Sequence, residues 1–270
     1  MINIVTLEGN SNLDPVGQRL KVLLCAYACE PGKGSEPGVG WTMACGLASL
    51  NDVWVLTRSN NRTAIESALK QRPVPSLHFI YYDLPAWARF WKRGSRGVHI
   101  YYYLWHLTSI FRVRAAHSSV GFDLSQHVTF VNHWMPSTLA FLRVPFIWGP
   151  VGTGDRLPRR FWRGLSFKGK CYELLRSLAQ YLGEHDPLVL VTAQRCVLGL
   201  ATTETTRRTI QRLGAKKTEV LTQLAFNDLE TDGEKGNSQY PVSEYRTLIT
   251  APPRKPEKNA IFVSRKLSAV

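Results

Sequence analysis

A glycine-rich stretch directly after the first apolar run has the residue types best suited to chemistry. It is Tyr27 to Gly40, YACEPGKGSEPGVG, with four glycines and two prolines. Glycine tolerates positive φ and lets a ligand approach the backbone closely, so the stretch predicts a loop. With a helix starting at Trp41, the N–H groups beneath Gly38 and Gly40 would meet the positive end of its dipole, which favours a phosphate. The alternative is that the glycines only form a tight turn, because neither the dinucleotide nor the P-loop fingerprint is matched.

Strands alternate with helices around this stretch. Apolar runs predict strands at 21–26, 52–57, 77–82, 124–130, 144–148, 198–202 and 220–221. Helical spacing predicts helices at 41–50, 61–70, 87–91, 98–116, 136–142, 159–182, 187–197 and 203–213. This alternation predicts an α/β fold: a parallel Rossmann-like sheet flanked by helices, with right-handed crossovers.

In such a sheet, ligands bind at the carboxyl ends of the strands. Three loops should therefore converge at that edge: Tyr27 to Gly40, His127 to Met135, and Gly149 to Asp155. For the glycines of the third loop the alternative is a simple turn after a strand. For either histidine of the second loop it is a structural role, bonded to a nearby backbone group.

Three segments resemble bacterial family 4 (group 1) glycosyltransferases. AYACEPGKGSEPGVGW, which ends at Trp41, is similar to the opening of that family. HVTFVNHWMPSTLAFLRVPFIWGPVGTGDRLP, His127 to Pro158, is similar to its middle segment, and AIFVSRK, Ala260 to Lys266, to the first strand of its second domain. The resemblance implies the GT-B architecture and retaining, metal-independent transfer of a sugar from a nucleotide sugar to a hydroxyl of a sugar or lipid-linked acceptor.

The resemblance also implies roles for the backbone groups of the loops. Gly38 and Gly40 would donate hydrogen bonds to the diphosphate. A second backbone cradle would be formed by Gly152, Thr153 and Gly154.

Side-chain roles follow in the same way. His127 is the candidate for the catalytic group that faces the sugar, and His133 is the second choice. The family's common pattern, counted from Asp123, instead gives Gln126 and Val128. The remaining roles are acceptor-hydroxyl binding by Glu36 and Asp155, and diphosphate binding by Arg265, preceded by Ser264 where the family has glycine.

Metal ligands and resident cofactors are not expected. The sequence has no HExxH motif and no DxD-type carboxylate pair, and no GxSxG elbow suggests a hydrolase. The nucleotide sugar is a co-substrate. Five cysteines, mostly inside apolar runs and without zinc spacing, indicate reduced thiols in a cytoplasmic protein.

A net charge of +14 calls for an acidic partner. Basic residues gather with aromatic ones in two stretches, Arg89 to Arg114 and Arg156 to Lys170. This mixture suits the surface of an anionic membrane, here the inner face, and the alternative is a pair of solvated helices with aromatic core faces. Nucleic acid is not expected, because no DNA- or RNA-binding motif accompanies the charge.

The chain divides into four segments by composition. Residues 1–20 predict a loose arm without the features of a signal peptide, and 21–226 the Rossmann-like acceptor domain. Residues 227–259 predict a poorly ordered linker, and 260–270 match the first strand of a donor domain. Because the sequence stops at Val270, we expect this polypeptide alone to be nearly inactive. The second function class left open is a non-enzymatic membrane- or carbohydrate-binding module.

Overall fold

The computed structural model describes residues 19–92, 94, 97–152 and 159–221. The predicted linker and the donor-domain strand lie outside the described residues, as does the predicted arm apart from its last two residues. The same holds for four predicted site residues, Thr153, Gly154, Asp155 and Arg265.

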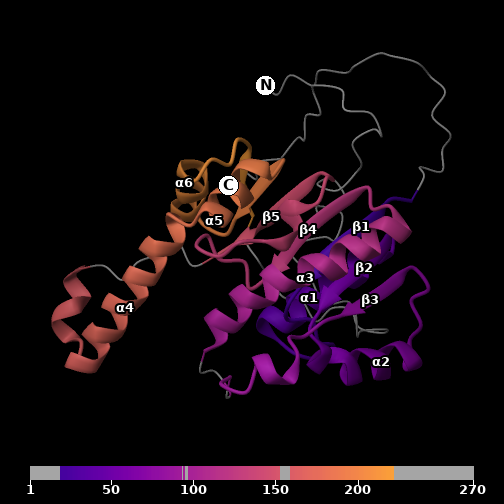
Figure 1. The fold of residues 1–270 in the computed structure, drawn as a ribbon, viewed down its shortest axis with the longest axis horizontal. Coiled ribbons are helices and arrows are strands. Elements are labelled where there is room, and N and C mark those ends of the chain that lie inside the picture. The colour runs from indigo at the N-terminus through magenta and orange to yellow at the C-terminus, as the bar shows by residue number, and fades with distance from the viewer. Residues whose placement is uncertain (1–18, 93, 95–96, 153–158, 222–270) are drawn as a thin grey trace, which may run out of the picture.

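Seven parallel strands form one sheet in the order β3-β2-β1-β4-β5-β6-β7 (Figure 1). The order reverses at β1, which pairs with β2 on one side and β4 on the other. This confirms the predicted Rossmann-like α/β class. The strands are β1 (Lys21–Ala26), β2 (Asp52–Thr57), β3 (Leu77–Tyr81), β4 (Leu124–Thr129), β5 (Phe146–Val151), β6 (Leu198–Ala201) and β7 (Thr218–Val220).

Helices cover both faces of the sheet because β1 is apolar on both. Val22 and Leu24 point to one side, into a core with α1 (Ser35–Ala48) and α2 (Arg62–Gln71). Leu23 points to the other, into a core with α3 (Val98–Val120) and α5 (Pro187–Arg195). The remaining helices are α4 (Phe167–Glu184), α6 (Glu204–Arg212) and the short 3-10 turns η1 (Ser59–Asn61), η2 (Ala86–Ala88), η3 (Thr138–Phe141) and η4 (Arg159–Gly164).

The first helix starts earlier than predicted. We expected a loop as far as Gly40, but α1 begins at Ser35. The two helical glycines are needed for contact: a Cβ on Gly38 would lie 2.0 Å from the Lys33 carbonyl oxygen, and one on Gly40 would lie 2.2 Å from that of Ala28. These two glycines, which suggested a turn in the sequence, therefore allow α1 to pack closely against the loop that precedes it.

The fifth strand ends later than predicted. We expected Gly149-Pro150 to close it after Trp148, but β5 continues to Val151. The register against β6 shifts between Trp148 and Val151. A proline is tolerated within a sheet at such an irregularity, where its missing N–H is not required.

Four helix predictions also need correction. The helix expected at 159–182 is a 3-10 turn, η4, followed by the separate helix α4. The helices expected at 87–91 and 136–142 are single 3-10 turns, η2 and η3. The helix expected at 98–116 continues to Val120, and Gly121 ends it with φ of 70°. Two large apolar side chains of this helix, Ile100 and Phe111, are exposed.

Helix α4 extends away from the body of the molecule, at the left of Figure 1. Its C-terminal end is fixed: Gly183 packs so closely on Trp134 that a Cβ would lie 2.4 Å from the Trp134 carbonyl oxygen. No helix among the described residues combines the length and apolarity needed to cross a bilayer.

Candidate functional site

The carboxyl ends of β1 and β4 meet where the strand order reverses, the place where parallel α/β sheets bind ligands. Thr129 joins the two strand ends: its Oγ1 accepts from the Ala28 amide at 3.1 Å and donates to the Ala28 carbonyl at 3.0 Å. Glu36, in the first turn of α1, accepts from the Phe130 amide through Oε2 at 2.9 Å. The loop after β1 is therefore held against the loop after β4.

The loop after β5 joins the same edge. The Gly152 amide donates to the Val131 carbonyl at 2.8 Å, and Gly152 forms an isolated parallel bridge with Asn132. The Thr202 hydroxyl donates to the Val151 carbonyl at 3.1 Å, which adds the end of β6. The structure thus brings the three loops into one continuous rim, defined here as residues 27–36, 129–133 and 151–152.

Gly38 and Gly40 lie next to this rim but inside α1. The amides at the start of the helix belong to Ser35 and Glu36, because Pro37 has no N–H. Because Gly38 and Gly40 have no Cβ, the first turns of α1 can pack directly against the backbone of Lys33 and Ala28. That they bind a diphosphate through their own amides stays a prediction.

His133 lies in the loop after β4 and is turned toward α4. Its Nε2 is 3.2 Å from Glu184 Oε1, and its side chain is 3% exposed. This contact fixes the C-terminal end of α4 to the rim. The predicted role in binding donor or acceptor stays a prediction.

His127 is enclosed beneath the rim. Its Nε2 lies 3.0 Å from the hydroxyl of Tyr102, and its ring centroid is 4.7 Å from that of His106, both from α3. Burial lowers the pKa of His127 to about 3 and that of His106 well below its ordinary value, with the charge of His127 as a further cause for His106. Both rings are therefore neutral at physiological pH.

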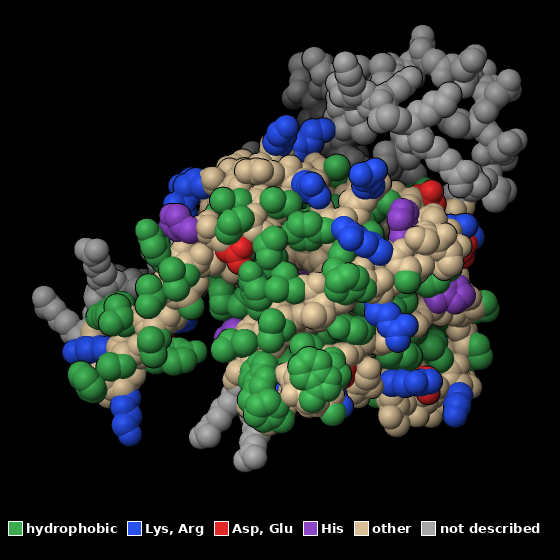
Figure 2. Space-filling model, in the orientation of Figure 1, with side chains coloured by type: hydrophobic (Ala, Val, Ile, Leu, Met, Phe, Trp, Pro, Cys, Tyr) green, Lys and Arg blue, Asp and Glu red, His purple; other side chains and the backbone are tan. Residues whose placement is uncertain are grey.

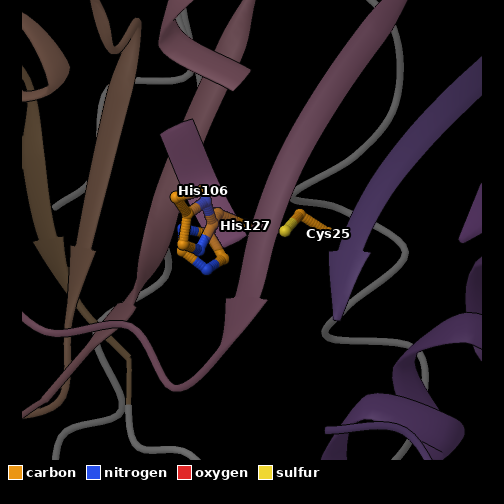
Figure 3. A group of neighbouring side chains, drawn as sticks. All are labelled: Cys25, His106 and His127. Atoms are coloured by element: carbon orange, nitrogen blue, oxygen red, sulfur yellow. The ribbon is translucent and has the colours of Figure 1, made fainter. Parts of the chain in front are cut away.

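Cys25, His106 and His127 form the one group among the described residues with metal-ligand composition (Figure 3). Their ligand atoms lie within 4.8 Å of one another. However, His106 Nδ1 accepts a hydrogen bond from the Thr138 amide at 3.2 Å, so the proton of the neutral ring is on Nε2. Burial also raises the pKa of Cys25, which keeps the thiol protonated. As arranged, the cluster is a polar contact in the core, and we assign it no metal.

A second polar group lies at the same sheet edge, beyond β1, and was not predicted. Arg58 follows β2, and its Nε donates to Asp83 Oδ1 at 3.0 Å. The hydroxyl of Tyr101 donates to the same carboxylate oxygen at 2.6 Å. The sequence did hold a signal, because Arg58 and Asp83 both come just after predicted strands.

A scan against protein-family models and a search of curated proteins gave no match. Among solved structures, the chain is similar to a sucrose-phosphate synthase from Thermosynechococcus elongatus, with 11% sequence identity and a TM-score of 0.43. The match covers 78% of this chain and 91% of that chain. The assignment of the fold itself depends on the strand order and parallel pairing described above.

Proposed function

We propose that this chain forms the acceptor-binding domain of a GT-B glycosyltransferase, which moves a sugar from a nucleotide sugar to a hydroxyl of a glycan or lipid-linked acceptor. Two of the segments that resemble family 4 glycosyltransferases contain the loops after β1, β4 and β5. The observation that carries the proposal is the contact between these loops, through Glu36 and Phe130 on one side and Gly152 and Val131 on the other.

Glu36 is the side chain best placed to receive an acceptor hydroxyl. It is half-buried, and its hydrogen bond to Phe130 fixes the carboxylate at the rim. A carboxylate held this way can accept from a hydroxyl and orient its oxygen, which is the main contribution a transferase makes to positioning. His127 enters the proposal as a positioning residue, because its contact with Tyr102 supports the end of β4 from below.

The experiment compares Glu36→Gln with Glu66→Gln in the full chain. Glutamine keeps an oxygen that can accept from Phe130 but removes the charge, and Glu66 is an exposed glutamate on α2 paired with Arg62. Labelled nucleotide sugars are offered with glycan and lipid-linked acceptors, and both product formation and saturable acceptor binding are measured. We expect Glu36→Gln to weaken binding or turnover by at least about tenfold and Glu66→Gln to have no effect. Absence of both binding and turnover in the wild-type chain would contradict the proposal.

The resemblance extends the proposal to retention of anomeric configuration and to transfer without a resident cofactor. The anomeric configuration of the first product, followed by NMR, tests the first point. Turnover that persists in a chelator tests the second.

A second proposal is that α4 docks on an anionic membrane. Its exposed apolar side chains stand out in Figure 2, on the projection at the left. Lys168, Lys170 and Arg176 lie on the same helix, a composition that suits a membrane interface. The exposed apolar residues are Phe167, Tyr172, Leu174, Leu175, Leu178, Tyr181 and Leu182.

Co-sedimentation with phosphatidylserine vesicles tests this proposal. We expect binding that weakens with salt and is lost when Phe167 and Leu175 are both changed to serine. The control is Phe111→Ser, an equally exposed aromatic residue on α3. Equal binding of the α4 variant and the control would overturn the proposal.

A further inference from the structure

A fixed guanidinium group lies at the carboxyl edge of β2. Its Nε is bound to Asp83, and its central carbon lies 5.3 Å from the ring centroid of Tyr27 and 5.1 Å from that of Tyr101. The Arg58 side chain is only 18% exposed. The salt bridge and the two aromatic rings therefore hold Arg58 in one orientation.

The outer end of this guanidinium is available for a ligand. Among the described residues, the one carboxylate paired with Arg58 is Asp83, and it is bound through Nε. The paired Nη groups of an arginine match the spacing of two oxygens on a phosphoryl group. Tyr27, whose ring lies next to Arg58, has a buried hydroxyl with no hydrogen-bond partner in the described structure. A ligand that reaches Arg58 could also supply that partner.

The charges around Arg58 do not balance. Lys92 Nζ lies 5.2 Å from the ring centroid of Tyr101, the same ring that Arg58 contacts. Arg89 lies 3.8 Å from Asp83. In the described structure Asp83 is the single carboxylate paired with this group, so three cations share one anion. An anionic ligand would remove the excess.

We propose that Arg58 and Lys92 bind a phosphoryl group of the acceptor, at the end of β2 and next to the rim. The proposal rests on the proposed function and names the substrate class: a hydroxyl acceptor that carries a phosphate monoester or diester. Arg58 holds two oxygens through its Nη groups, Lys92 adds a second charge, and Tyr27 donates its hydroxyl. Asp83 is a positioning residue that fixes the guanidinium through Nε.

Calorimetric titration of the full chain tests the site with four probes. They are inorganic pyrophosphate, a hexose 1-phosphate, the same hexose without phosphate, and a short-chain lipid phosphate below its micelle concentration. We expect saturable binding of one or both phosphorylated organic probes and none of the neutral hexose. The two organic probes distinguish a soluble from a lipid-linked acceptor, and binding of pyrophosphate alone would identify an adventitious anion site and overturn the proposal.

The variants separate the effect of the charge of Arg58 from the effect of the shape of its guanidinium group. We expect Arg58→Gln to raise the Kd of the phosphorylated probe at least tenfold. The Kd should rise about tenfold in Arg58→Lys and about fivefold in Lys92→Gln. The matched control is Arg62→Gln: Arg62 also lies over a tyrosine ring, that of Tyr81 at 5.3 Å, and also pairs with a carboxylate, but it is exposed on α2. Thermal melts confirm folding, and Arg58→Lys and Lys92→Gln carry the test if Arg58→Gln does not fold.

Equal affinity in the wild type and the Arg58 and Lys92 variants, or an equal loss in Arg62→Gln, would overturn this inference. Its failure can be distinguished from failure of the proposed function. Transfer to a phosphorylated acceptor that is unchanged in Arg58→Gln would refute the phosphoryl site and leave glycosyl transfer intact. Phosphate binding without any sugar transfer would support the phosphoryl site and refute glycosyl transfer.

Discussion

Gly40 shows how a single missing side chain sets the geometry of the rim. A Cβ there would lie 2.2 Å from the Ala28 carbonyl oxygen and 3.1 Å from the Thr129 methyl group. Both neighbours belong to the hydrogen-bonded pair that joins β1 to β4. The glycine therefore lets α1 lie directly on the junction of the two strands.

We predict that Gly40→Ala lowers the free energy of unfolding by about 2 kcal/mol or more, because the contacted atom is backbone and cannot move aside. Gly46→Ala is the control in the same helix. It is exposed, nothing lies within 4 Å of its added Cβ, and helix propensity should stabilise it by about 1 kcal/mol. Urea unfolding measures both, and similar values for the two variants would contradict the packing explanation.

His106 and His127 make stability depend on pH. Their pKa values are lowered by burial in the folded protein, so near pH 6 the unfolded chain binds protons that the folded chain does not. Stability is therefore complete above the unfolded value near 6.5 and is lost as the pH falls below it. We predict a loss of about 1 kcal/mol per histidine between pH 7 and pH 5.5.

The measurement is the urea midpoint across that range for the wild type and for His106→Gln and His127→Gln. Each variant should flatten the dependence by about half, even where it lowers stability overall. A wild-type midpoint that does not move with pH would refute the prediction.

For single residues, the sequence indicated which residue types lie near the candidate site but not which neighbours their side chains contact. Glu36 was chosen for its place in the loop, and the structure holds it at the rim. His127 and His133 were chosen as functional candidates, and both are enclosed by neighbours from elements distant in sequence: Tyr102 on α3 and Glu184 on α4. Such contacts depend on tertiary packing, which local spacing does not encode.

Among the elements, strands β1 and β2 were predicted with the limits that the structure shows, and helix α6 was predicted within one residue at each end. The predicted range of α6 starts at Thr203, and the structure shows this residue as the N-cap, whose Oγ1 accepts from the Thr206 amide at 3.2 Å. Capping is a local interaction, so it can be read from a short window of sequence. The start of α1 was predicted too late because its glycines allow close packing. The sequence alone does not show whether a glycine forms a turn or allows such packing.

We predict that Thr203→Ala costs about 1 kcal/mol of stability, because the first turn of α6 loses its side-chain acceptor. Thr205→Ala is the control two residues later, where the side chain is exposed and alanine is the better helix former. Thermal unfolding followed by circular dichroism compares them. Equal destabilisation by the two variants would show that the cap contributes nothing.

For the whole molecule, the alternation of strands and helices was sufficient to predict the parallel sheet. Crossovers between parallel strands are right-handed almost without exception, which leaves few ways to order the strands. What alternation does not predict is the outlying position of α4. Its apolar residues read like those of a core helix, and only the structure shows that they remain exposed.

The central position of β1 has a consequence for synthesis on the ribosome. One edge of β1 pairs with β2, but the other edge can pair only after β4 has been synthesised, about a hundred residues later. Pairing across such a separation is slow, and until it occurs the nascent polypeptide presents an apolar strand with unmatched backbone groups. We predict that a product halted after Val120 aggregates, whereas one halted after Leu221 is recovered in the supernatant. Centrifugation of translation products released at those two codons would measure the difference.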